Sequence, residues 1–100
     1  MSVTNYDTTA EHTAEIKAGR DRKLAIVLRN THPAWIVSEQ VNFANSTCVF
    51  DVVFRYGGRW VRRRYIYDAE VDVLHFDGEA LFDEAQLLTL PDDQLFTPPT

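Results

Sequence analysis

The sequence predicts a mostly β domain of the α+β class: an antiparallel meander of five to six short strands, either open or curled into a small barrel, followed by one C-terminal helix. Apolar and polar residues alternate in several short runs, which is the period of a strand with one buried face. Turn residues interrupt these runs at intervals of about ten positions, so most neighbouring strands are expected to pair as hairpins. One segment near the C-terminus has apolar residues at helical spacing.

The length and composition fit a single domain over residues 1–100. One hundred residues are close to the commonest domain size. Apolar residues make up 45% of the chain and charged residues 25%, so the chain can fill a core and carries too few charges for a disordered protein. The polar segments 1–12 and 96–100 are expected to be flexible ends.

The residue pattern of the N-terminal third predicts two strands separated by a turn. Residues 8–18 combine the alternation of a strand with the Ala and Glu content of a helix; the strand is favoured and a short helix is the alternative. Gly19 then predicts a turn. Residues 23–29 alternate strictly and predict a strand with one buried side. That side consists of Leu24, Ile26 and Leu28.

The middle of the chain predicts three strands in succession. Apolar and polar residues alternate over 35–43, except that Glu39 falls on the apolar side and indicates a bulge, a sheet edge or a functional exception. Residues 48–56 form the most apolar run and predict a central strand. A glycine pair then predicts a tight hairpin, because glycine adopts positive φ without strain, and residues 59–67 return as the paired strand.

The last third predicts one more strand and the helix. Residues 71–76 alternate as a strand, and the Asp-Gly pair at 77–78 predicts the turn that ends it. Residues 80–90 have apolar positions at helical spacing, with acidic residues in the first turn, where the helix dipole favours them. Pro91 stops this helix, and a short turn is expected at 92–95.

The charges of the chain are divided sharply along the sequence. Residues 1–64 carry all 10 basic and 6 acidic side chains, a net charge of +4. Residues 65–100 carry 9 acidic and no basic side chains, a net charge of −9. This division predicts two surfaces of opposite sign on a protein whose net charge is −5. The acidic surface is expected to include Asp68, Glu70 and Asp72.

One strand combines arginines with aromatic residues and is the predicted contact element. Guanidinium forks bind carboxylates and phosphates, and Trp, Tyr and Arg dominate the energetics of interfaces. We therefore expect a non-catalytic interaction or regulatory protein that binds a protein partner through this strand. The alternative is that the arginines form ion pairs with carboxylates of the same chain. The predicted contact residues are Arg59, Trp60, Arg62, Arg63, Arg64, Tyr65 and Tyr67.

Three other functions remain open from the sequence. The same strand could bind RNA or DNA by neutralising phosphates and stacking bases, although the net charge of −5 counts against it. Two copies of the chain could associate by pairing a basic surface with an acidic one. A small enzyme or ligand carrier would need a pocket, which the predicted fold places under the C-terminal helix.

No motif in the chain identifies a catalytic or metal site. The three histidines are far apart, no serine lies in a Gly-x-Ser-x-Gly motif, and Cys48 lies in an apolar run that predicts burial. We therefore expect no enzyme activity, no cofactor and no metal. A polar start without signal-peptide character, the lack of a long apolar run and the single cysteine predict a cytoplasmic protein that does not enter a membrane.

Overall fold

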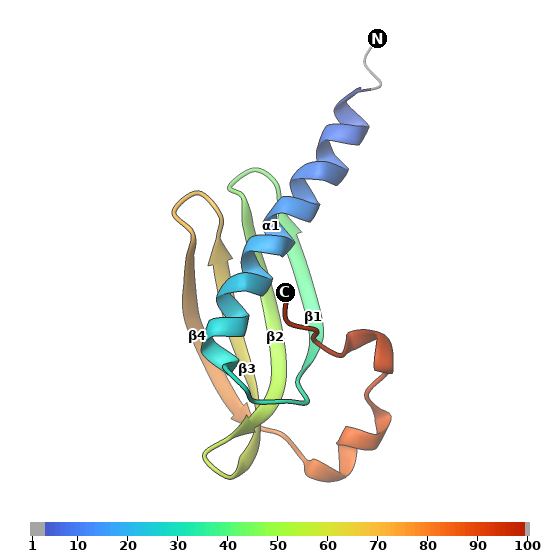
Figure 1. The fold of residues 1–100 in the computed structure, drawn as a ribbon, viewed down its shortest axis with the longest axis vertical. Helices are drawn as coiled ribbons and strands as arrows, with labels where there is room; N and C mark the ends of the chain where they lie inside the picture. Colours follow the sequence, from blue (N-terminus) through green and yellow to red (C-terminus); the bar gives the residue numbers. More distant parts are fainter. Residues whose placement is uncertain (1–3, 100) are drawn as a thin grey trace.

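The computed structural model describes residues 4–99 and contains one long helix and a four-stranded antiparallel sheet (Figure 1). Each strand pairs with the next one along the chain, in the order β1-β2-β3-β4. The α+β class and the antiparallel meander are confirmed; the sheet has four strands and is open, so five to six strands and a barrel are not confirmed. The elements are α1 (Thr4–Leu28), β1 (Trp35–Asn42), β2 (Thr47–Tyr56), β3 (Arg59–Asp68), β4 (Val73–Leu81) and two 3₁₀ turns, η1 (Glu84–Thr89) and η2 (Asp92–Gln94).

The N-terminal helix replaces the two strands predicted at 8–18 and 23–29. Its buried apolar residues are Ile16, Leu24 and Leu28, which are spaced by eight and four positions and therefore share one helical face. Ile26, which completed the alternating pattern, is 67% exposed. Leu24 and Leu28 thus fit the period of a strand and that of a helix equally well. Only their packing against the sheet distinguishes the two. The helix alternative at 8–18 is the correct one.

The predicted turn at Gly19 is also wrong, because this glycine lies inside α1 and against β3. A Cβ atom at this position would overlap the hydroxyl oxygen of Tyr67 and lie 2.9 Å from its ring carbon Cζ. Tyr67 is itself buried and donates a hydrogen bond of 2.6 Å from its hydroxyl to Asp72 Oδ1. The missing side chain therefore allows the helix and the sheet to approach closely.

Replacing Gly19 by Ala is expected to destabilise the protein, although the same change in an exposed helix would stabilise it by about 1 kcal/mol. The added methyl group must displace a buried tyrosine, which costs about 1–3 kcal/mol. Urea unfolding followed by circular dichroism measures the change. Ala18→Gly, at the exposed neighbouring position, is the control and should cost only about 0.5–1 kcal/mol. A stability gain in Gly19→Ala would contradict the close contact.

The C-terminal third differs from the prediction in two ways. Strand β4 runs through the predicted turn at 77–78, because Gly78 adopts a φ of 143° and the pairing with β3 shifts register at that point, which forms a bulge. The predicted helix at 80–90 is wrong: its first residues end β4, and the rest form η1, capped by Asp83, whose Oδ1 accepts from the amide of Ala85. Leu88 belongs to the apolar stripe expected for this helix, but it is 94% exposed and does not pack against the core. The short turn expected at 92–95 is present as η2.

The structure describes part of each of the two ends for which flexibility is predicted. Helix α1 begins at Thr4, so it includes most of 1–12, while residues 1–3 and 100 lie outside the described residues. At the other end, the amide of Phe96 donates to the carbonyl of Ala34 at 2.8 Å. This bond and the packing of Phe96 against the core fasten the C-terminal segment beside β1.

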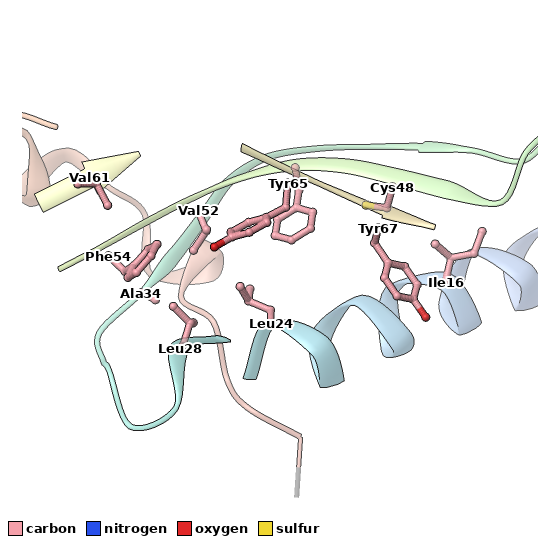
Figure 2. Close-up of a cluster of buried hydrophobic side chains, with 11 residues drawn as sticks. Ile16, Leu24, Leu28, Ala34, Cys48, Val52, Phe54, Val61, Tyr65 and Tyr67 are labelled. Atoms are coloured by element: carbon pink, nitrogen blue, oxygen red, sulfur yellow. The ribbon is translucent and has the colours of Figure 1, made fainter. Parts of the chain in front are cut away.

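The core lies between α1 and the sheet face that the helix crosses (Figures 1 and 2). Figure 2 shows side chains of the helix directed at aromatic and branched side chains of the two central strands. In the described part of the chain, no helix covers the opposite face of the sheet. The buried cluster consists of Ile16, Leu24, Leu28, Ala34, Cys48, Phe50, Val52, Phe54, Val61, Tyr65 and Tyr67.

The predicted burial of Cys48 is confirmed, and it has a chemical consequence. Burial raises the pKa of the Cys48 thiol, and this outweighs the charge of Arg20, whose Nη1 lies 3.7 Å from the sulfur. The reactive thiolate is therefore both disfavoured and inaccessible. We expect a disulfide reagent to label Cys48 at the rate of unfolding in buffer and at once in denaturing urea. Rapid labelling of the folded protein would contradict the burial.

Candidate interaction surface

The predicted contact strand, β3, is divided between the two faces of the sheet. It lies between β2 and β4, so its side chains point alternately toward α1 and away from it. Tyr65 and Tyr67 point toward α1 and are buried in the core. The partner-binding role predicted for these two tyrosines therefore needs correction, because neither can reach a partner. Arg59, at the β2–β3 hairpin, is exposed on the same side of the sheet as the tyrosines.

Three further residues of the predicted set, Trp60, Arg62 and Arg64, lie on the uncovered face. The side chains of Arg62 and Arg64 are 43% and 53% exposed, and Trp60 is half-buried beside them. Arg55 of β2 pairs with Trp60 in the sheet and is exposed on this face as well. Sequence analysis did not include Arg55, although its position in the alternation of β2 would have placed it there. We call the group Arg55, Trp60, Arg62 and Arg64 the arginine face.

A buried aspartate holds the two central arginines side by side. Asp51 Oδ2 accepts from Arg62 Nε, and Asp51 Oδ1 accepts from Arg64 Nε, both at 2.8 Å. Burial by itself would raise the pKa of the Asp51 carboxyl, but the hydrogen bonds and charges of the two arginines outweigh it and hold that pKa below its usual value. Asp51 is therefore an anion that orients both guanidinium groups.

Asp51 leaves most of the outer nitrogens of these two guanidinium groups without a hydrogen bond in the described chain. Among the described residues, no hydrogen bond uses either Nη atom of Arg62 or the Nη1 atom of Arg64, and the Nη2 atom of Arg64 has one long bond of 3.4 Å to Asp51. Residues two apart on a strand are separated by about 6–7 Å. The arginine face can therefore bind two carboxylate or phosphate groups at that spacing, next to an aromatic ring.

Arg63 lies on the opposite face and is bound inside the protein. Its Nε and Nη2 donate to Glu79 Oε1 at 2.8 and 2.6 Å, and its Nη1 donates to the Tyr65 hydroxyl at 2.9 Å. These interactions raise the pKa of Arg63 even though desolvation opposes them. Internal pairing, the alternative from the sequence, thus holds for Arg63, and it holds in part for Arg62 and Arg64, whose Nε atoms pair with Asp51. The rings within 6 Å of its guanidinium carbon are Phe54, Tyr56, Tyr65 and Phe76.

The predicted acidic residues lie where β3 ends and the chain turns toward β4. Asp72 accepts from the Tyr67 hydroxyl and pairs with Lys23 of α1 at 3.3 Å, so it joins the sheet to the helix. Burial, followed by the contact with Asp72, raises the pKa of Tyr67 to about 12. Asp68 caps the turn by accepting from the amide of Glu70 at 3.0 Å. Asp68, Glu70 and Asp72 therefore lie at the end of β3 and in the turn that follows it, and they do not share one face of a continuous strand.

Sequence analysis missed a buried ion cluster between α1 and β1. Arg20 is only 5% exposed; its Nη1 donates to Glu39 Oε1 at 2.6 Å and its Nε donates to Asp21 Oδ1 at 2.9 Å. Lys17 donates to the other oxygen of Glu39 at 2.9 Å. The one available signal was Glu39 on the apolar side of its strand, and its function there is to neutralise a helix arginine.

A cleft of about 580 Å³ lies beside this ion cluster, between α1, β1 and the C-terminal segment. Arg20 and Glu39 line it together with Ser38, Phe96 and Thr97. The pocket expected under a C-terminal helix is thus replaced by a cleft beside an extended segment. Three charged residues of the ion cluster line the cleft, Arg20, Asp21 and Glu39, and Arg20 is already bonded to both carboxylates, so the group attaches α1 to β1.

The described residues contain neither a metal-binding cluster nor a membrane-spanning helix, and comparisons with known proteins identify no relative. Within residues 4–99, no cluster of three or more His, Cys, Asp or Glu residues could hold a metal ion. The described helices include none that is long and apolar enough to span a membrane. No family model, no curated protein and no solved structure matches the chain. Its function is therefore inferred from geometry.

Proposed function

We propose that the chain is a non-catalytic interaction protein whose arginine face binds an acidic segment of a partner protein. The observation that carries this proposal is the pair of guanidinium groups held by Asp51, whose outer nitrogens form only one long bond, from Arg64 Nη2 to Asp51, within the described chain. Carboxylates bind such groups through charge-assisted hydrogen bonds, and Trp60 supplies an apolar contact beside them. The proposal includes no cofactor or metal, and the single buried thiol suits a reducing compartment such as the cytoplasm.

The residues around the arginine face favour a short acidic segment over a nucleic acid. The one carboxylate among Arg55, Arg62 and Arg64 is that of Asp51. Asp68 and Asp77 lie at the margins of the arginine face. A nucleic acid presents a continuous row of phosphates that would extend past these margins and meet negative charge. A short peptide with two or three carboxylates could bind within the arginine face without reaching these aspartates.

Binding of labelled ligands tests the proposal directly. Fluorescence anisotropy is measured with a ten-residue peptide of alternating Glu and Leu, with an alternating Gln and Leu control, and with single- and double-stranded oligonucleotides, at about 50 and 200 mM salt. We expect binding of the Glu peptide, weaker at high salt, and little binding of the Gln peptide. Binding of oligonucleotides with steep loss at high salt would replace the proposal by the nucleic-acid alternative. No binding of any ligand would overturn both.

A further inference from the structure

The segment after β4 forms a loop whose two ends are held close together. The amide of Phe82 donates to the carbonyl of Trp60 at 2.9 Å, and Leu95 forms an antiparallel bridge with Trp35. The rings of Trp35 and Trp60 are 6.0 Å apart, so the loop leaves and re-enters the sheet at neighbouring points. We call residues 82–95 the acidic loop. Compact loops with adjacent ends are frequently functional.

The acidic loop presents an apolar side chain in acidic surroundings. Leu88 of η1 is 94% exposed, and none of the residues of the two turns η1 and η2, all of them described, is buried. The loop is nevertheless ordered by its own bonds, such as the cap by Asp83 and the bond from the amide of Leu90 to the carbonyl of Leu87 at 3.2 Å. It has no basic residue, and its carboxylates are Asp83, Glu84, Asp92 and Asp93.

We infer that the acidic loop of one copy binds the arginine face of a second copy. This inference rests on the proposed function and names its partner. The loop has the chemistry that the face requires, because it combines several carboxylates with an exposed leucine, and the face combines guanidinium groups with Trp60. Opposite charges on the two surfaces would guide the encounter and set the orientation.

The loop does not occupy the arginine face of its own chain. Its ends are attached near the starts of β1 and β3, and Figure 1 shows the orange turn η1 beyond this end of the sheet and the red turn η2 beside β1. Arg62 and Arg64 lie two and four residues farther along β3 than the attachment at Trp60. Among the described residues, no hydrogen bond or ion pair joins the loop to either arginine, so the face is left for another molecule.

Association of this kind pairs the acidic loop of one copy with the arginine face of another. Two copies that exchange their loops reciprocally form a two-fold dimer, whereas copies that bind in succession form rings or open chains. The charges that pair across the contact are exposed, so salt should weaken the association.

Sedimentation velocity of the full chain tests this inference with two variants and their mixture. The loop variant is Glu84→Gln/Leu88→Gln, and the face variant is Arg62→Gln/Arg64→Gln; neither removes a buried side chain. We expect the wild type to form dimers or larger species at low salt and high concentration, and each variant alone to remain a monomer. An equimolar mixture of the two variants retains one intact loop and one intact face, so it should form a discrete dimer.

The outcomes separate this inference from the proposed function. A wild type that stays monomeric at low salt but binds the acidic peptide would overturn the inference and leave the proposed function in place. Association that neither variant reduces would also overturn it, because another surface would then be responsible. A monomeric wild type that binds no acidic peptide would overturn both. Two variants that each stay monomeric alone and form a dimer when mixed would establish the contact between the acidic loop and the arginine face.

Discussion

Replacing Glu39 by Ala is expected to lower the free energy of unfolding by about 2–3 kcal/mol. Removing one partner of a buried ion pair typically costs about 3–5 kcal/mol, because the other charge is left without compensation. Arg20 would remain buried with only Asp21 as a bonded carboxylate. The expected value is lower than the full range because Glu39 itself is 37% exposed and partly screened by water.

The pH dependence of the Glu39→Ala effect provides a second readout. Burial would raise the pKa of Glu39, but the hydrogen bonds and charges of Arg20 and Lys17 outweigh it and lower that pKa below its unfolded value. The stabilisation is therefore complete above the unfolded pKa of about 4.3 and is lost as the pH falls through the lower folded pKa. The stability difference between wild type and variant should shrink in that acidic range.

Urea unfolding at neutral pH and below pH 4 measures both effects, and Glu15→Ala is the matched control. Glu15 is an exposed glutamate on α1, and removing it should change stability by less than about 0.5 kcal/mol. Equal effects of the two substitutions would contradict the structural importance of the buried ion cluster.

Replacing Arg62 and Arg64 together by Gln is expected to reduce the affinity for the acidic peptide at least a hundredfold. Hydrogen bonds to charged groups contribute about 1.5–3 kcal/mol each, and every 1.4 kcal/mol corresponds to a tenfold change in affinity. Glutamine keeps an N–H donor for the buried carboxylate of Asp51 but removes its two compensating charges, so we expect a retained fold of lower stability. Circular dichroism and thermal unfolding verify this before affinity is compared by anisotropy.

The control for this double substitution is Arg22→Gln/Arg29→Gln, which removes the same charge from exposed positions on and after α1. We expect the control to bind within about threefold of the wild type, because distant exposed charges are screened by salt. A similar loss in both double variants would show that net charge governs binding, and the arginine face would lose its assigned role.

Local patterns predicted the central part of the sheet correctly because its signals agree. The apolar run of β2 is buried, the alternation of β3 largely matches its burial, and the glycine pair after Tyr56 forms the hairpin between these two strands. In α1, the short spacing between Leu24 and Leu28 satisfies both periods, and only the contact with the sheet identifies the helix. In β4, the bulge at Gly78 continues a strand that the Asp-Gly pair seemed to end.

The same reasoning explains how much of the site was predictable. The sequence located the arginine strand, and its alternation separated Arg63 from Arg62 and Arg64. It could not show which of the two faces would be covered, because the covering helix was predicted as strands. The burial of Tyr65 and the exposure of Arg62 therefore followed only from the position of α1.

The most direct test of the central claim observes the arginine side chains during binding. Two-dimensional ¹⁵N NMR resolves Arg Nε–H and Trp indole signals while the unlabelled Glu-Leu peptide is added. We predict that the side-chain signals of Arg62, Arg64 and Trp60 shift with a common affinity, while that of Arg22 on α1 stays unchanged. Shifts confined to Arg20 beside the cleft, or to Arg22, with constant Arg62 and Arg64 signals, would contradict the assignment of the arginine face as the binding surface.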